Sequence, residues 1–262
     1  MSAKLANAPV YYALVQVRFN PVALMAKFAA EMQDRLRRSG YPIFETLQSQ
    51  HFEFDPSQPV DAKPTVIDNS NWFFTSTDKL SGYVLGSNFF TFQTTNYSDH
   101  ENFFAAFNKG LELLNEIASI GTCSRLGIRY LDAVIPNEDE SLNAFLDPKV
   151  QGVEFGFPWI GSAWESGFET EEGVLVAKIY KARSSLLGFP NDLQPRSLVM
   201  NEKFSLSEPK AHAVIDIDHF TEAEIDIDTS DINSILTNLH AQIGKCFRAI
   251  ATDHAFSRWS QR

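Results

Sequence analysis

The sequence predicts an α+β protein in which one or two twisted antiparallel sheets are covered by three main helices. Residues 125–130 alternate between apolar and cationic side chains, which is the period of a strand with two unlike faces. Apolar residues at helical spacing follow positions 20, 98 and 229. The last of these segments is long and has one apolar stripe, so we expect it to pack on a sheet.

Composition and charge narrow the class further. The 262 residues are 44% hydrophobic and 21% charged, as in soluble globular proteins. The net charge of -11 disfavours nucleic-acid binding, because that binding relies on Lys and Arg to neutralise phosphates. No apolar run is long enough to span a membrane, and no signal peptide is recognised, so we expect a cytoplasmic protein. Cys123 and Cys246 are too isolated to indicate a disulfide framework or a zinc ribbon.

The first strand and helix follow from a change of period near residue 20. Residues 10–19 alternate, which places Tyr11 on the apolar face and Tyr12 on the mixed face. Asn20 and Pro21 then have the residue types of a helix N-cap and first helical position. We therefore expect the first helix to begin there.

The next elements complete an N-terminal lobe. Residues 72–95 contain three short β-prone runs separated by turn residues, which predicts an antiparallel meander. Ser98 and Glu101 form a capping-box pattern that would open the second helix. The strand of residues 123–136 follows.

An acidic connector at residues 137–140 divides the chain into an N-terminal lobe, 1–136, and a C-terminal lobe, 137–262, which could also form one continuous domain. The second lobe begins with a Gly-rich and aromatic loop at 152–168. Strands are expected at residues 173–182, 198–206 and 212–219, the last with a solvated acidic face. The final helix would be capped near Thr229 or Ser230 and end near Trp259.

Four segments carry a resemblance to a known family. They are NAPVYYALVQVRF at residues 7–19, Tyr41-Pro42, RLGIRYLD at residues 125–132 and LHAQIGKCFRAIATDHAFSRW at residues 239–259. Together they resemble a sporadically distributed bacterial and archaeal protein family of uncharacterised function. The resemblance brings no established catalytic activity that could be carried over to this chain, and the family's patchy occurrence suggests a role in defence or toxin control.

The arginines of the central strand form the first candidate site. Arg125 and Arg129 would share a face with Gln16 and Arg18 if the two strands are neighbours. Guanidinium groups bind carboxylate or phosphate through paired hydrogen bonds, so this patch could hold an anion. The alternative is that the arginines form cross-strand ion pairs with the abundant carboxylates.

The aromatic loop is the second candidate. Phe157, Trp159 and Trp164 would be good anchors for a partner protein if exposed. If folded inward, the tryptophans would instead fill the gap between the two halves.

Metal and catalytic sites receive less support. His212, Asp216 and Asp218 point the same way along one strand, but their spacing keeps them from converging on one ion, so we expect no metal. His240 and His254 have the helical positions of core histidines. No phosphate loop, dinucleotide fingerprint or other cofactor motif occurs, so no cofactor is expected.

These observations predict a non-catalytic cytoplasmic binding protein for a protein partner or a small anionic ligand, with homo-oligomer formation left open. One alternative is an enzyme with a cleft between the lobes, the arginines as anion clamps and His212 or His240 as acid or base. Another is an RNA-binding or RNA-processing module that stacks bases on three phenylalanines of the meander. These are Phe89, Phe90 and Phe92.

Overall fold

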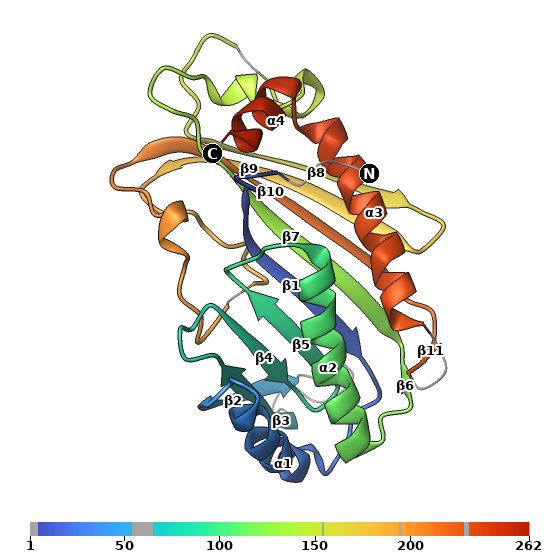
Figure 1. Cartoon of the computed structure of the whole chain (residues 1–262). Helices are drawn as coiled ribbons and strands as arrows, with labels where there is room; N and C mark the ends of the chain where they lie inside the picture. The colour runs from blue at the N-terminus through green and yellow to red at the C-terminus, as the bar shows by residue number, and fades with distance from the viewer. Residues whose placement is uncertain (1–4, 54–64, 154, 194, 228–230, 262) are drawn as a thin grey trace, which may run out of the picture.

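The computed structural model describes residues 5–53, 65–153, 155–193, 195–227 and 231–261. One antiparallel sheet of nine strands, in the order β2-β3-β4-β5-β1-β7-β10-β9-β8, dominates this part of the chain (Figure 1). The predicted α+β class is confirmed. The strands are β1 (Val10–Arg18), β2 (Ile43–Glu53), β3 (Thr65–Thr75), β4 (Ser81–Leu85), β5 (Phe89–Thr94), β7 (Arg125–Val134), β8 (Gly161–Glu169), β9 (Val174–Ser184) and β10 (Lys210–Thr221).

Helices and short elements complete the described chain. The helices are α1 (Met25–Arg38), α2 (His100–Ala118), α3 (Ile232–Ile250) and α4 (Asp253–Ser260), with single 3-10 turns η1 (Leu142–Ala144), η2 (Pro148–Val150) and η3 (Glu202–Phe204). A separate two-stranded ladder joins β6 (Thr122–Cys123) to β11 (Ile225–Asp226).

The centre of the sheet contains strands from both halves of the chain. β7 pairs with β1 on one side, where Ile128 opposes Val15, and with β10 on the other, where Tyr130 opposes Ile217. Residues 1–136 and 137–262 therefore contribute to the same sheet.

One face of the sheet, called the helix face here, carries the main core. Val15, Ile128 and Ile217 point to this face and are fully buried beneath the helices. Leu236 and Leu239 of α3 belong to the same cluster, and α2 and α3 lie side by side across the sheet (Figure 1). The prediction that the C-terminal helix packs on the apolar side of the central strand is confirmed.

The opposite face, called the second face, is partly covered by an irregular segment between Ser184 and Lys210, of which residues 185–193 and 195–209 are described. Leu187, Phe189 and Phe204 of this segment pack on Leu131 and Val214 of the sheet. The strand predicted at residues 198–206 is wrong. That segment contains only the turn η3, because its apolar residues pack on a sheet face instead of pairing along a sheet edge.

β1 departs from simple alternation near its start. Its register with β7 shifts between Val10 and Tyr12, which makes Tyr11 the extra residue of a β-bulge. Tyr11 therefore joins Tyr12 on the second face, and its hydroxyl donates a 2.7 Å hydrogen bond to the Gly188 carbonyl. The prediction that Tyr11 lies on the main core face is wrong for this reason.

The first two helices begin later than predicted. α1 starts at Met25, because the residues after β1 form an irregular turn that is tied to the β4–β5 turn by the hydrogen bond from Val22 N to Ser87 O. Asn20 and Pro21 therefore precede the helix. The N-cap of α2 is Asp99, whose carboxylate accepts a hydrogen bond from Asn102 N at 2.9 Å.

The final helix is two helices. α3 ends at Ile250, Ala251 makes a strand-like bridge to Leu146, and Thr252 caps α4 by accepting a hydrogen bond from Ala255 N. The predicted N-caps at positions 229 and 230 lie outside the described residues, and Asp231 caps α3.

Candidate functional site

The structure brings the four residues of the candidate anion patch to one face of two neighbouring strands. Arg18 opposes Arg125 across the β1–β7 ladder, and Gln16 opposes Gly127. Arg129 lies farther along β7 on the same second face. The environments of the three arginines nevertheless differ.

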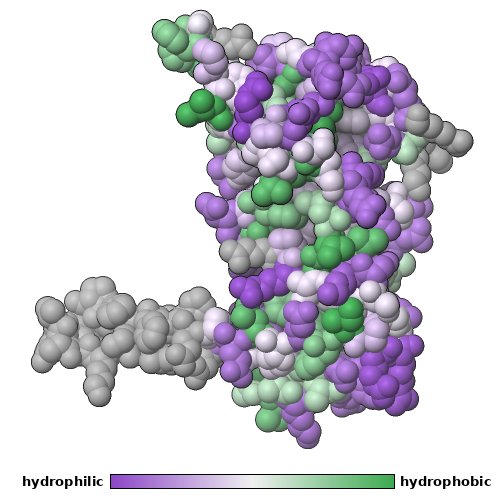
Figure 2. Space-filling view, turned by 90° about the vertical axis from the view of Figure 1, so that its left-hand side faces the viewer, coloured by the Kyte–Doolittle hydropathy of each residue, from purple (hydrophilic) through white to green (hydrophobic). Residues whose placement is uncertain are grey.

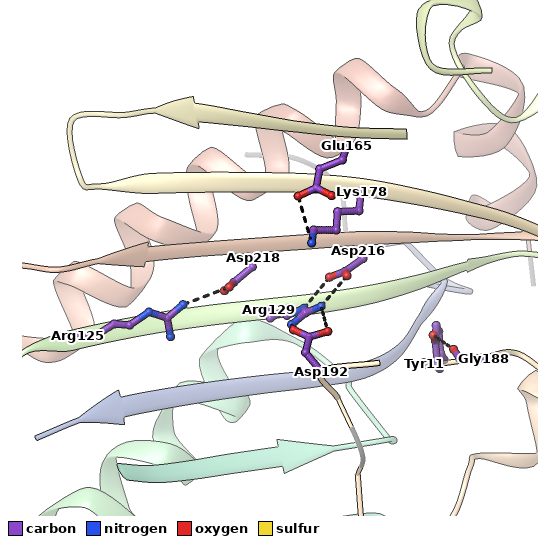
Figure 3. Close-up of polar contacts among 9 residues, drawn as sticks. All are labelled: Tyr11, Arg125, Arg129, Glu165, Lys178, Gly188, Asp192, Asp216 and Asp218. Carbon is purple, nitrogen blue, oxygen red and sulfur yellow. Dashed lines mark hydrogen bonds and ion pairs between the residues drawn. The ribbon is translucent and has the colours of Figure 1, made fainter. Parts of the chain in front are cut away.

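Arg129 is held between two carboxylates (Figure 3). Its Nε and Nη2 donate to the two carboxylate oxygens of Asp216, each at 2.7 Å. Its Nη1 and Nη2 also donate to Asp192 at 2.5 and 3.2 Å. Burial lowers the pKa of Arg129, but the hydrogen bonds to Asp216 and Asp192 outweigh burial and raise the pKa above its ordinary value. Two carboxylates already occupy this guanidinium, so Arg129 fastens the segment of residues 185–209 to the sheet.

Arg125 has one carboxylate partner and one aromatic partner. Its Nη2 lies 3.2 Å from Asp218 Oδ2, and its guanidinium carbon lies 3.9 Å from the centre of the Phe220 ring. Gly127 makes room for this stack, because a Cβ there would lie 2.8 Å from Phe220 Cβ. Burial lowers the pKa of Arg125, Asp218 opposes this effect, and Arg18 adds to it.

Arg18 is exposed, and its Nε donates a 3.2 Å hydrogen bond to Gln16 Oε1. Gln16 in turn donates to Thr91 Oγ1 at 2.9 Å. Among the described residues, no carboxylate forms an ion pair with Arg18. The uncompensated positive charge of the predicted patch is therefore at Arg18 and not at Arg129.

The carboxylates of β10 are not a solvated acidic face, so that prediction is wrong. Asp216 is only 1% exposed, and both it and Asp218 pair with arginines of the adjacent strand. The described residues contain no group of three or more side chains placed to hold a metal ion. His212 is buried, and its Nδ1 lies 3.0 Å from the Lys210 carbonyl oxygen.

His240 and His254 do not converge with the arginines. His240 lies on α3, which covers the helix face, whereas Arg125 and Arg129 lie on the second face. The His240 ring stacks on His100 at 4.4 Å, and burial with help from His100 lowers the pKa of His240 to about 4. His254 instead contacts Glu140 near the surface, at 3.1 Å.

The described cavities do not support a cleft that uses the arginines. A cavity of ≈900 Å³ lies between α2 and the start of α3, where Asn108, Glu112 and Asn233 line it. Neither Arg125 nor Arg129 reaches this cavity.

The phenylalanines proposed to stack RNA bases are mostly inaccessible. Phe90 and Phe92 are 0% and 4% exposed and pack beneath α2, and Phe89 is partly buried. The sheet surface expected for base stacking therefore belongs to the core.

The aromatic segment before β8 is the most apolar exposed region. Phe155 and Phe157 are each 75% exposed and contact one another, with ring centres 5.3 Å apart. Val153 and Ile160 are 89% and 93% exposed. Figure 2 shows hydrophobic residues projecting from the upper end of the molecule, where Figure 1 places this part of the chain.

The two tryptophans of this region fold inward. Trp159 and Trp164 pack against the main core, and Lys181 Nζ lies 5.2 Å from the Trp159 ring centre while donating a hydrogen bond to the Gln151 carbonyl. Phe155, Phe157 and Ile160 are therefore exposed apolar residues of the predicted partner-binding loop, whereas its two tryptophans are not.

The second part of the predicted loop is the strand β8, which forms one edge of the sheet (Figure 1). Its nine residues pair with β9, and seven of them are exposed. Sequence reasoning missed this strand because its glycines and serines dilute the apolar alternation. The usable signal was the spacing of Trp164 and Phe168, which both face the helix side and oppose the core residues Ile179 and Leu175.

None of the helices in the described ranges has the length and hydropathy needed to traverse a bilayer. The family resemblance based on sequence motifs stays a prediction. The chain matches no protein-family model, no curated protein and no solved structure.

Proposed function

We propose that this protein is a non-catalytic binding protein that engages a partner protein at a docking surface made of β8 and residues 153 and 155–160. One observation carries the proposal. Among the residues whose burial is described, five of the nine exposed large hydrophobic side chains lie within residues 153–168, beside a strand edge that no other described strand occupies. Exposed apolar patches next to polar groups are typical of protein interaction sites.

The arrangement of titratable groups supports binding over catalysis. A catalytic acid or base must come within hydrogen-bond reach of the reacting group. His240 and the arginines lie on opposite faces of the sheet, and Arg129 is already bound by two carboxylates. We therefore assign no catalytic residue.

The setting of the function follows from the sequence. Cys123 and Cys246 are both free thiols, which fits a reducing compartment such as the cytoplasm. The family resemblance suggests that the partner belongs to a defence or toxin-control system.

A capture experiment with matched variants tests this function. The immobilised full chain is incubated with extract from its native host, and bound proteins are identified by mass spectrometry. A double variant, Phe155→Ser with Phe157→Ser, should lose a partner that Leu186→Ser retains, because Leu186 is equally exposed at 75% but lies outside the docking surface. Equal capture by the wild type and the double variant would contradict the proposal.

A second candidate function is binding of a small carboxylate or phosphate at Arg18 and Arg125. The observation that favours it is the pairing of two arginines across β1 and β7 with only Asp218 as a carboxylate partner in the described part of the chain. Calorimetric titration with phosphate and with citrate tests it, and binding should be lost in Arg18→Gln.

A further inference from the structure

We infer that the docking surface takes an extended segment of a partner protein that adds to the edge of β8 and alternates basic with apolar residues. This inference rests on the proposed function and specifies the chemistry of the partner. It follows from the hydrogen-bonding edge of β8, from the side chains on its two faces and from its charge.

The free hydrogen-bonding groups of β8 can be identified from its hairpin with β9. Thr170 N donates to Gly173 O at 2.8 Å, so Thr170 and Gly173 form a hydrogen-bonded pair. The next pair of the ladder is Glu169 with Val174, so the same register continues into the two strands. Hydrogen-bonded and non-hydrogen-bonded pairs alternate in an antiparallel ladder. The even-numbered residues of β8 therefore bond to β9, and the odd-numbered residues direct their N–H and C=O groups outward. The outward residues are Gly161, Ala163, Glu165, Gly167 and Glu169.

This edge has few of the features that normally prevent strand addition. Sheet edges are often protected by proline, lysine, bulges or short strands. β8 is nine residues long and contains neither proline nor lysine. Its register with β9 runs without a break from Gly161 to Glu169. A strand of another polypeptide can thus extend the sheet here.

The two faces of β8 select different side chains from an added strand. Trp164 and Phe168 lie on the helix face. Trp164 is partly buried and Phe168 is 45% exposed, so both would pack against apolar residues of the added strand. Glu165 and Glu169 lie on the second face and are exposed, and cross-strand pairing favours cations opposite them. An added strand that alternates apolar and basic residues satisfies both faces.

The charge of the whole region agrees with a basic partner. Residues 150–177 contain five glutamates and neither lysine nor arginine. Within the described chain, Lys178 of β9 pairs with Glu165 at 3.2 Å, and Lys181 lies over Trp159. A second copy of this chain is disfavoured as the occupant, because it would bring another glutamate-rich edge of like charge against the first.

Synthetic peptides provide the test. The full chain is titrated into fluorescein-labelled TKVKVKVKT and into the acidic analogue TEVEVEVET, and binding is followed by fluorescence anisotropy. We expect the basic peptide to bind at least about tenfold more tightly than the acidic one. Several exposed ion pairs between its lysines and the glutamates of β8 together account for about a tenfold difference in affinity. Its affinity should fall as salt is added.

Two variants separate strand addition from other binding. Ala163→Pro removes an outward N–H while leaving the bonds to β9, so it should weaken binding of the basic peptide at least about tenfold. Glu165→Gln with Glu169→Gln should weaken the basic peptide and not the acidic one. Leu186→Ser should bind the basic peptide like the wild type. Circular dichroism checks that each variant is folded.

Three outcomes would overturn the inference: equal affinity for both peptides, unchanged binding by folded Ala163→Pro, or a wild-type dimer in light scattering that Ala163→Pro dissociates. Each is distinguishable from failure of the proposed function. If neither peptide binds but the Phe155→Ser and Phe157→Ser double variant still loses its captured partner, the result rules out strand addition. The docking surface of the proposed function is then still supported.

Discussion

Arg129 of β7 and Asp192 of the irregular segment are 63 residues apart in the chain and form an ion pair at 2.5 Å. The same guanidinium also pairs with Asp216, whose side chain is 2% exposed, whereas that of Asp192 is 63% exposed. One arginine thus joins a buried strand carboxylate to a surface segment. The two partners should contribute unequally to stability.

Replacing Arg129 should be costly. Arg129→Met leaves the Asp216 carboxylate buried without its partner, so we expect a loss of about 3–5 kcal/mol in the free energy of unfolding, measured by urea denaturation. Adding Asp216→Asn should restore part of the loss, and Asp192→Asn alone should cost less than about 1 kcal/mol. Arg37→Met removes an exposed pair with Asp34 and serves as the control. If Arg129→Met changed the free energy of unfolding by less than about 0.5 kcal/mol, the stabilising role of the Arg129 ion pairs would be refuted.

The buried Asp132 should make stability fall as pH rises. Burial, with a smaller effect of Asp216, raises the pKa of Asp132 to about 8 from 3.8 in the unfolded chain. The folded state therefore binds the proton more tightly, and the contribution present at low pH is lost as the pH approaches 8. Between pH 5 and 7 the loss should be roughly 2 kcal/mol relative to Asp132→Asn, which does not titrate. If the free energy of unfolding changed equally between pH 5 and 7 in the wild type and in Asp132→Asn, this assignment would be contradicted.

His240 should act in the opposite direction. Its pKa is lowered to about 4 by burial and by His100, below the unfolded value of 6.5. The unfolded chain therefore takes up the proton first, and stability is lost as the pH falls below 6.5. Between pH 7 and pH 5 the wild type should lose roughly 2 kcal/mol of unfolding free energy through His240. His240→Phe keeps an aromatic ring against His100 and should not show this loss. NMR titration of the imidazole gives an independent check, and an ordinary pKa there would rule out the effect.

Two helix glycines should respond oppositely to alanine. A Cβ at Gly110 of α2 would lie 2.4 Å from Tyr83 Cε1 and 2.9 Å from Phe90 Cζ, so Gly110→Ala should cost about 1–3 kcal/mol despite better helix propensity. At Gly244 of α3 the nearest atom outside the helix backbone would be Arg248 Nη1, at 3.7 Å. Gly244→Ala should therefore stabilise the protein by about 0.5–1 kcal/mol. The melting temperatures of both variants, measured by thermal unfolding, test this prediction. A shift of the melting temperature in the same direction for both variants would contradict the packing argument.

The sequence predicted the parts of this fold that follow from local alternation. The two unlike faces of residues 125–134 and the stripe of α3 are local patterns, and both appear in the structure. The start of α1 was not predictable in this way, because it is set by a backbone bond from Val22 to Ser87. The bulge at Tyr11 likewise depends on the register with β7.

The same distinction applies to the candidate sites. That Arg125 and Arg129 share a face follows from their spacing, but the choice between an anion and ion pairs depends on residues brought in from other segments. Asp192 supplied one of these partners from an irregular segment with no recognisable pattern. The exposed edge of β8 was hidden for a related reason, since only the sheet order shows which strand has a single neighbour.

The place of β1 in the sheet affects how the chain can fold during synthesis. β1 is made before both of its neighbours, β5 and β7, whose residues Phe92 and Ile128 oppose Val15, and β7 in turn precedes its partner β10. The nascent chain must hold this apolar strand without its first partner until β5 has been made, and without its second partner until β7 has been made. Such long-range pairing slows folding and exposes the growing chain to aggregation, so we expect production in cells to depend on chaperones and on a lowered temperature.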